Sequence, residues 1–155
     1  MIGIVLVGHA PLASAMLDCV SHILGTRPTS LLALDVLPDE PAEQLRGRIL
    51  SSVQTLGDCA DGLVFLTDLF GATPSNAVVQ IVSESDQVKT LVVSGCNVPM
   101  LLRTLTYRHQ SLQSLGEKIV MGGRNGIVST GGAPPQRQKL NAAEQNASTR
   151  DHHQQ

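Results

Sequence analysis

Aromatic side chains are nearly absent from this chain of 155 residues, which has one tyrosine, two phenylalanines and no tryptophan. Single-stranded nucleic acids bind by stacking bases on several aromatic faces, so the composition argues against that class of partner. Charge is also sparse: only 15% of the residues are charged, whereas an average soluble domain has about 25%. The formal net charge of −2 provides no electrostatic footprint for nucleic acid or for direct binding to an anionic membrane.

The chain also lacks cysteine pairs. Cys19, Cys59 and Cys96 are widely spaced and form no Cys-x-x-Cys motif. Zinc ribbons and thioredoxin-like redox sites are therefore not expected, and the unpaired thiols favour a reducing compartment. No basic residue precedes the apolar run at residues 2–7, which is unlike a signal peptide and far too short to span a bilayer. We expect a cytoplasmic protein with no cofactor and no bound metal.

Apolar runs alternate with amphipathic segments along the chain. The runs are rich in β-branched residues and are typical of strands buried on both faces, at residues 2–7, 31–36, 62–66, 90–94 and, as a short last strand, 126–129. Apolar residues at helical spacing predict helices at residues 11–24, 41–56 and 75–83, from 99 onward, and at 112–121. Strands that alternate with helices predict an α/β fold with a mostly parallel sheet.

The composition changes near the C-terminus. Residues 1–131 carry all the expected strands and helices, so we expect them to form one domain. Residues 132–155 are dominated by Pro, Gln, Asn and Ser, and Leu140 is their only large apolar side chain. Such a segment cannot bury enough surface to offset the entropy lost on ordering. We therefore predict a disordered polar tail at residues 132–155.

Three polar loops follow expected strands, and in a parallel sheet they meet at the carboxyl edge, where open α/β sheets bind ligands. They carry His9, Asp68 and Asn97. If the first and third strands are neighbours, Asp68 faces His9 and fixes its tautomer, which leaves the other ring nitrogen free as a nucleophile. The alternatives are a loop histidine that only ends its strand and an aspartate in an Asx-turn.

Other motifs suggest less chemistry. Cys96 beside His9 and Asp68 would offer zinc three ligands, but three loops with no spacing signature make a zinc hydrolase a weak alternative. Gly-Gly-Arg-Asn-Gly at residues 122–126 does not lead from a strand into a helix, as a dinucleotide-binding loop must, and is interpreted as a turn. Thr73 or Ser75 is a candidate cap for the helix expected at residues 75–83.

Taken together, the motifs resemble a known family. Ile-Val-Leu-Val-Gly-His at residues 4–9, Thr-Asp-Leu-Phe-Gly-Ala-Thr-Pro at 67–74 and Asn-Val-Pro-Met-Leu-Leu at 97–102 resemble the mannose-type enzyme IIA proteins of the bacterial sugar phosphotransferase system. The resemblance covers about residues 1 to 130. It implies a doubly wound α/β domain with helices on both faces of the sheet, and a homodimer. Because the short last strand is too small to stand alone at a sheet edge, we expect it to pair with the partner's sheet.

The resemblance also implies a phosphoryl relay. His9 accepts a phosphoryl group from the carrier protein HPr and passes it to an enzyme IIB, and Asp68 is its carboxylate partner. Thr73 and Asn97 match positions in the same pocket, and we add Ala10 and Thr67 to it because they flank the catalytic pair. Contact with the membrane is then only indirect, through the IIC and IID subunits. The alternative is a regulatory module in which the phosphorylation state of His9 controls another protein; neighbouring IIB, IIC and IID genes would favour transport.

Overall fold

The computed structural model describes residues 1–56, 61–84 and 88–131. Four strands form one sheet in the order β2-β1-β3-β4, and every neighbouring pair is parallel. The strands are β1 (Gly3–His9), β2 (Leu31–Val36), β3 (Leu63–Thr67) and β4 (Thr90–Ser94). The helices are α1 (Leu12–Leu24), α2 (Ala42–Thr55), α3 (Thr73–Ser83), α4 (Val98–Tyr107) and α5 (Leu112–Asn125). The expected mostly parallel α/β sheet is confirmed.

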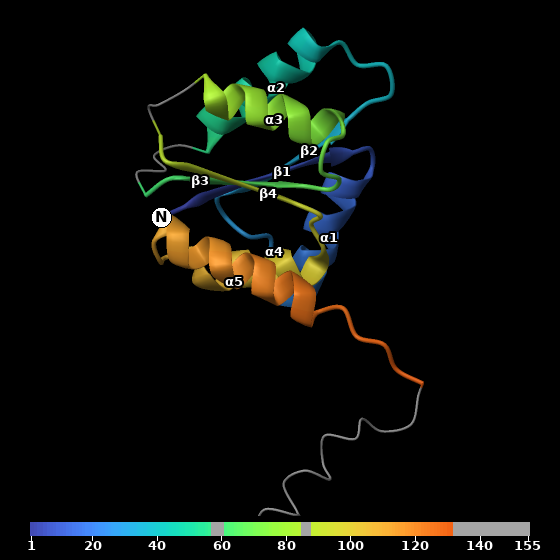
Figure 1. Cartoon of the computed structure of the whole chain (residues 1–155), viewed down its shortest axis with the longest axis vertical. Helices are drawn as coiled ribbons and strands as arrows, with labels where there is room; N and C mark the ends of the chain where they lie inside the picture. Colours follow the sequence, from blue (N-terminus) through green and yellow to red (C-terminus); the bar gives the residue numbers. More distant parts are fainter. Residues whose placement is uncertain (57–60, 85–87, 132–155) are drawn as a thin grey trace, which may run out of the picture.

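The helices lie on both faces of the sheet. Figure 1 shows α2 and α3 on one side, and α1, α4 and α5 on the other. The central strand β1 explains this arrangement, because its side chains alternate between the two faces. Ile4 and Leu6 pack into the core with α1, α4 and α5, whereas Val5 and Val7 pack with α2 and α3. A strand buried on both faces needs a continuous apolar run, which is what residues 2–7 provide.

The end of the chain's described part differs from the sequence prediction. Helix α5 continues to Asn125, so the glycine-rich stretch expected to be a turn is its last turn. A Cβ at position 123 would lie 2.5 Å from Cγ of Met100. Helix α5 packs so closely on α4 that only glycine fits at positions 122 and 123. This packing overrides the low helix propensity of glycine.

The short strand expected at residues 126–129 is not formed in this structure. Ile127 and Val128 leave α5 as an irregular segment, with 77% and 72% of their surface exposed. A strand forms only where a neighbouring strand supplies hydrogen bonds. Within the described part of this chain, no strand pairs with these residues. The tail predicted at residues 132–155 lies outside the described residues.

Two smaller differences concern α3. The helix begins at Thr73 instead of Ser75, and Ala72 occupies the position that precedes it. Neither Thr73 nor Ser75 caps the helix, because no side chain accepts a hydrogen bond from its first turn.

No helix in residues 1–56, 61–84 and 88–131 combines the length and hydropathy needed to cross a bilayer.

Candidate functional site

His9 and Asp68 meet at the carboxyl edge of the sheet. His9 ends β1 and Asp68 follows β3, and these strands are neighbours, so the condition set by the sequence is met. Oδ2 of Asp68 lies 2.8 Å from Nδ1 of His9 and accepts a 2.8 Å hydrogen bond from the His9 backbone N–H. The Leu69 N–H donates to Oδ1 at 2.8 Å. Hydrogen bonds from His9 and Leu69 thus fix the position of the Asp68 carboxylate.

The electrostatics favour an ionised Asp68. Burial of its side chain, which is 9% exposed, raises the carboxyl pKa, but the hydrogen bonds from His9 and Leu69 outweigh burial and hold the pKa below its ordinary value. An ionised carboxylate accepts a hydrogen bond from the N–H of Nδ1, which leaves Nε2 of His9 as the ring nitrogen with a free lone pair. The His9 side chain is 52% exposed, so a reacting group can reach it.

Gly8 makes room for this contact, a role that the sequence analysis did not foresee. A Cβ at position 8 would lie 3.4 Å from both Cγ and Oδ2 of Asp68. A methyl group would therefore be in van der Waals contact with the carboxylate, and a longer side chain at position 8 would compete with it for space. The only sequence signal was the interruption of a β-branched run by glycine directly before the histidine.

The four other residues that were assigned to a phosphoryl pocket occupy different environments. Ala10 is exposed beside His9, and its N–H donates to the Val36 carbonyl. Thr73 is exposed at the first position of α3. Thr67 is fully buried. Asn97 uses its side chain within the fold, because Oδ1 caps α4 through the Met100 N–H at 2.9 Å.

Cys96 lies near the pair but is a poor candidate ligand for a metal. Burial, and then the charge of Asp68, raise the pKa of its thiol to about 11, whereas metals bind the thiolate. The Sγ atom lies 3.6 Å from Sδ of Met16. Within the described ranges, no group of three His, Cys, Asp or Glu side chains is arranged to hold a metal ion.

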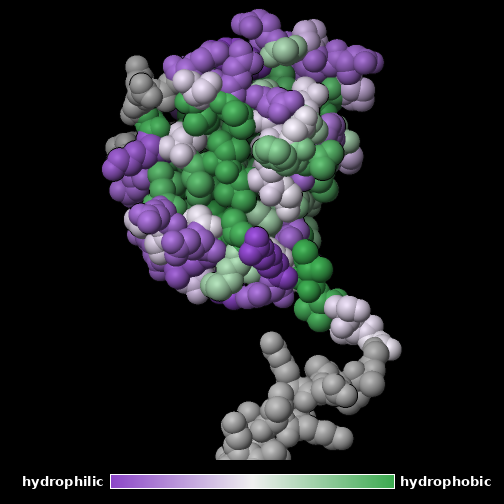
Figure 2. Space-filling view, viewed as in Figure 1, coloured by the Kyte–Doolittle hydropathy of each residue, from purple (hydrophilic) through white to green (hydrophobic). Residues whose placement is uncertain are grey.

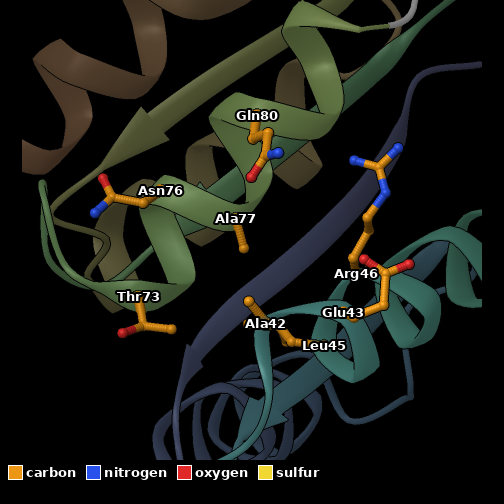
Figure 3. Close-up of a pocket in the computed structure, with 8 residues that line it drawn as sticks. All are labelled: Ala42, Glu43, Leu45, Arg46, Thr73, Asn76, Ala77 and Gln80. Carbon is orange, nitrogen blue, oxygen red and sulfur yellow. The ribbon is translucent and has the colours of Figure 1, made fainter.

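A separate cavity of about 300 Å³ lies between α2 and α3. Figure 3 shows Arg46 and Glu43 on one wall and Gln80 and Asn76 on the other. Neither His9 nor Asp68 lines it. The Arg46 guanidinium is paired with Glu84 at 2.6 Å, and its other nitrogen, Nη1, is buried with no hydrogen-bond partner. Because Nη1 is buried, it offers no hydrogen bond to a molecule in this cavity.

Comparison with known proteins identifies the family. The EIIA-man model, described as "PTS system fructose IIA component", matches residues 3–120. The chain belongs to this family, the mannose-type EIIA components of the sugar phosphotransferase system, as its motifs predicted. PTS EIIA components are subunits of a phosphotransferase.

Curated relatives agree with this assignment. The chain is 37% identical over 99 residues to the sorbose-specific EIIA component of Lacticaseibacillus casei, which covers 64% of this chain and 68% of that protein. It is 31% identical over 135 residues to the mannose-specific EIIAB component of Escherichia coli K12. That match covers 86% of this chain and 41% of the relative, so the chain spans less than half of the E. coli protein's length.

Solved structures share the fold. The EIIA component from Streptococcus agalactiae superposes with a TM-score of 0.73 at 24% identity, over 83% of this chain and 97% of that one. The mannose/sorbose-specific IIA subunit from Enterococcus faecalis gives a TM-score of 0.73 at 16% identity, over 86% of this chain and 97% of that one. The doubly wound α/β architecture is therefore that of EIIA proteins.

Proposed function

We propose that this chain is a phosphoryl carrier in which His9 receives a phosphoryl group from phospho-HPr and passes it to an enzyme IIB. The lone pair of Nε2 attacks phosphorus. A new N–P bond forms on His9 while the N–P bond of the donor histidine breaks, and the donor imidazole leaves with the bonding electron pair. The 2.8 Å contact between Nδ1 of His9 and Oδ2 of Asp68 carries the proposal. It leaves the lone pair of Nε2 free to react, and it offsets the positive charge that the ring gains.

Charge on the phosphoryl oxygens must also be met, since phosphoryl transfer depends mainly on positioning and electrostatics. The three motifs contain no lysine or arginine. Helices α1, α3 and α4 all begin at this edge of the sheet, and the N–H groups of a helix start attract anions. Weak stabilisation by amides, together with groups supplied by the partner protein, suits an intermediate that must give the phosphoryl group up again.

Incubation with enzyme I, HPr and phosphoenolpyruvate, followed by intact mass spectrometry, tests the proposal. We expect the mass of one phosphoryl group, lost in acid, in the wild type and in His22→Ala and His109→Ala, and none in His9→Ala. Loss of the phosphoryl mass in His22→Ala or His109→Ala, with the mass kept in His9→Ala, would show that the site is misassigned. Subsequent transfer to an enzyme IIB separates a transport role from a purely regulatory one.

We also infer that the working unit is a homodimer. Strand β4 is an edge of the sheet, and its residues are only half-buried. Figure 2 shows apolar surface across the middle of the face on which β4 lies. Ile127 and Val128 are apolar and exposed, and they pair with no strand in the described part of this chain. Pairing of residues 127–131 with β4 of a second copy would cover both exposed features.

Light scattering tests the homodimer. We expect a dimer at micromolar concentration for the wild type, and a shift toward monomer for the double substitution Ile127→Lys and Val128→Lys. Ile23→Lys is the matched control, because Ile23 on α1 is also exposed, at 51%, and lies outside the segment. A monomeric wild type, or dissociation by the control alone, would contradict the proposal.

A further inference from the structure

A chain of three hydroxyl groups lies beneath the first turn of α3. Thr67 Oγ1 donates to Ser94 Oγ at 2.7 Å, and Ser94 Oγ lies 3.2 Å from Ser75 Oγ. Thr67 and Ser94 end the neighbouring strands β3 and β4 and are register partners. Ser75 is the third residue of α3. The chain therefore joins two strand ends to the start of a helix, directly before Asp68 in the sequence.

These hydroxyls occupy positions that favour apolar side chains. Two residues earlier in the same strands, Phe65 and Val92 point to the same face and belong to the apolar core with α3. Thr67 is fully buried and Ser75 is 1% exposed. Buried hydroxyls are costly unless bonded to one another, and a bonded network fixes a more specific arrangement than apolar contacts do.

Three of the helices that begin at this edge, α1, α3 and α4, differ in what their third N–H contacts. In α1 the Ser14 N–H donates to Asp35 Oδ1 at 3.1 Å, and in α4 the Met100 N–H donates to Asn97 Oδ1 at 2.9 Å. In α3 the corresponding N–H belongs to Ser75 and has no acceptor among the described residues. Helix α3 is also the helix connected to Asp68 by a short loop.

We propose that the hydroxyl chain of Thr67, Ser94 and Ser75 is a positioning device for the phosphoryl transfer proposed above, on which it rests. The first turn of α3 has no side-chain cap. The hydroxyls fix this turn from below, and with it the short loop that joins Asp68 to α3. Thr67 and Ser75 are positioning residues, because both are buried and act through the backbone around them instead of touching the phosphoryl group.

Paired substitutions at Thr67 separate positioning from packing. Thr67→Val keeps the shape and removes the hydroxyl, whereas Thr67→Ser keeps the hydroxyl and removes a methyl group. For transfer from phospho-HPr, we expect kcat to fall on the order of fivefold in Thr67→Val, as for one hydrogen bond of ordinary strength, and to be restored in Thr67→Ser. The KM for phospho-HPr should not change in either variant, because a buried hydroxyl cannot contact the donor protein.

Thr104 supplies the matched control. It is also fully buried, and its hydroxyl bonds the Met100 carbonyl within α4, on the opposite face of the sheet. Thr104→Val should leave kcat unchanged. Equal kcat in the wild type and Thr67→Val, or rates that follow thermal stability in both Thr67 variants, would overturn the positioning role while phosphorylation of His9 still stood. Absence of phosphorylation in the wild type would instead overturn the proposed function.

Discussion

Helices α3 and α4 begin one strand apart, after β3 and β4, and both carry proline at the second position. The start of α4 is capped by Asn97, whose amide nitrogen also approaches the Gly123 carbonyl at 3.4 Å. The start of α3 follows Ala72 and has no side-chain cap. The start of α4 is thus fixed by a cap, whereas the start of α3 is fixed by the buried hydroxyls beneath it.

The largest effect should come from the carboxylate beside the uncapped start. Asp68→Asn keeps the size of the side chain and removes the charge that offsets the imidazolium formed as His9 reacts. A carboxylate behind a catalytic histidine is worth up to about 10⁴-fold in rate, and we expect a smaller loss because the partner supplies charge as well. The initial rate of transfer from phospho-HPr measures it. A rate equal to that of the wild type would leave Asp68 as a turn residue.

A cap can be installed on α3 to make the two helix starts alike. Ala72 has the extended backbone of a cap residue, with φ −85° and ψ 171°, so Ala72→Asn should bond the Ser75 N–H. We expect the variant to be more stable by about 1 kcal/mol, because the cap gives a helix-start N–H an acceptor.

Chemical denaturation of the Ala72→Asn variant checks this prediction. Ala72→Val serves as the control, since it adds bulk without an acceptor. Equal stability in Ala72→Asn and the wild type would show that the start of α3 gains nothing from a cap.

The sequence predicted the pairing of His9 with Asp68 on the condition that the first and third strands are neighbours, and the structure meets that condition. Each residue follows an apolar run, and parallel strands bring their carboxyl ends together. The hydroxyl chain could not be predicted, because it depends on the register that sets Thr67 beside Ser94 and on the height of α3 above the sheet. No local pattern contains that information.

The end of α5 was mispredicted for a related reason. Glycine is a poor helix former, so Gly122 and Gly123 indicated a turn. Their actual environment is the contact of α5 with α4, where a Cβ at position 122 would clash with the Arg103 side chain. Packing against a distant segment decided the local structure, and a single sequence shows such packing only as an unexplained small residue.

Removal of the existing cap should affect stability. Asn97→Ala deprives the Met100 N–H of its acceptor, and we expect the free energy of unfolding to fall by about 1 kcal/mol, within the usual range for a lost N-cap. Urea denaturation measures the change. Asn97→Asp is the informative companion, because an aspartate can cap the same N–H. A loss as large in Asn97→Asp as in Asn97→Ala would show that α4 does not depend on this bond.

The smallest expected effect is a difference in pH dependence between the two helix starts. Hydrogen bonds from His9 and Leu69 hold the pKa of Asp68 below its ordinary value of 3.8 despite burial. A carboxyl group whose pKa is lowered by folding contributes stability that is fully present above its unfolded pKa and is lost as the pH falls through the native pKa. The Asn97 cap is a neutral amide and does not titrate.

Urea denaturation from neutral pH to below pH 3.8 therefore distinguishes the two. The difference in unfolding free energy between wild type and Asp68→Asn should shrink as the pH falls below that value, because protonation removes the charge that the substitution removes. The difference between wild type and Asn97→Ala should stay constant over the same range. Other carboxylates titrate in all three proteins and largely cancel in these differences. An Asp68→Asn difference that is flat with pH would mean that the native carboxylate gains nothing from His9 and Leu69.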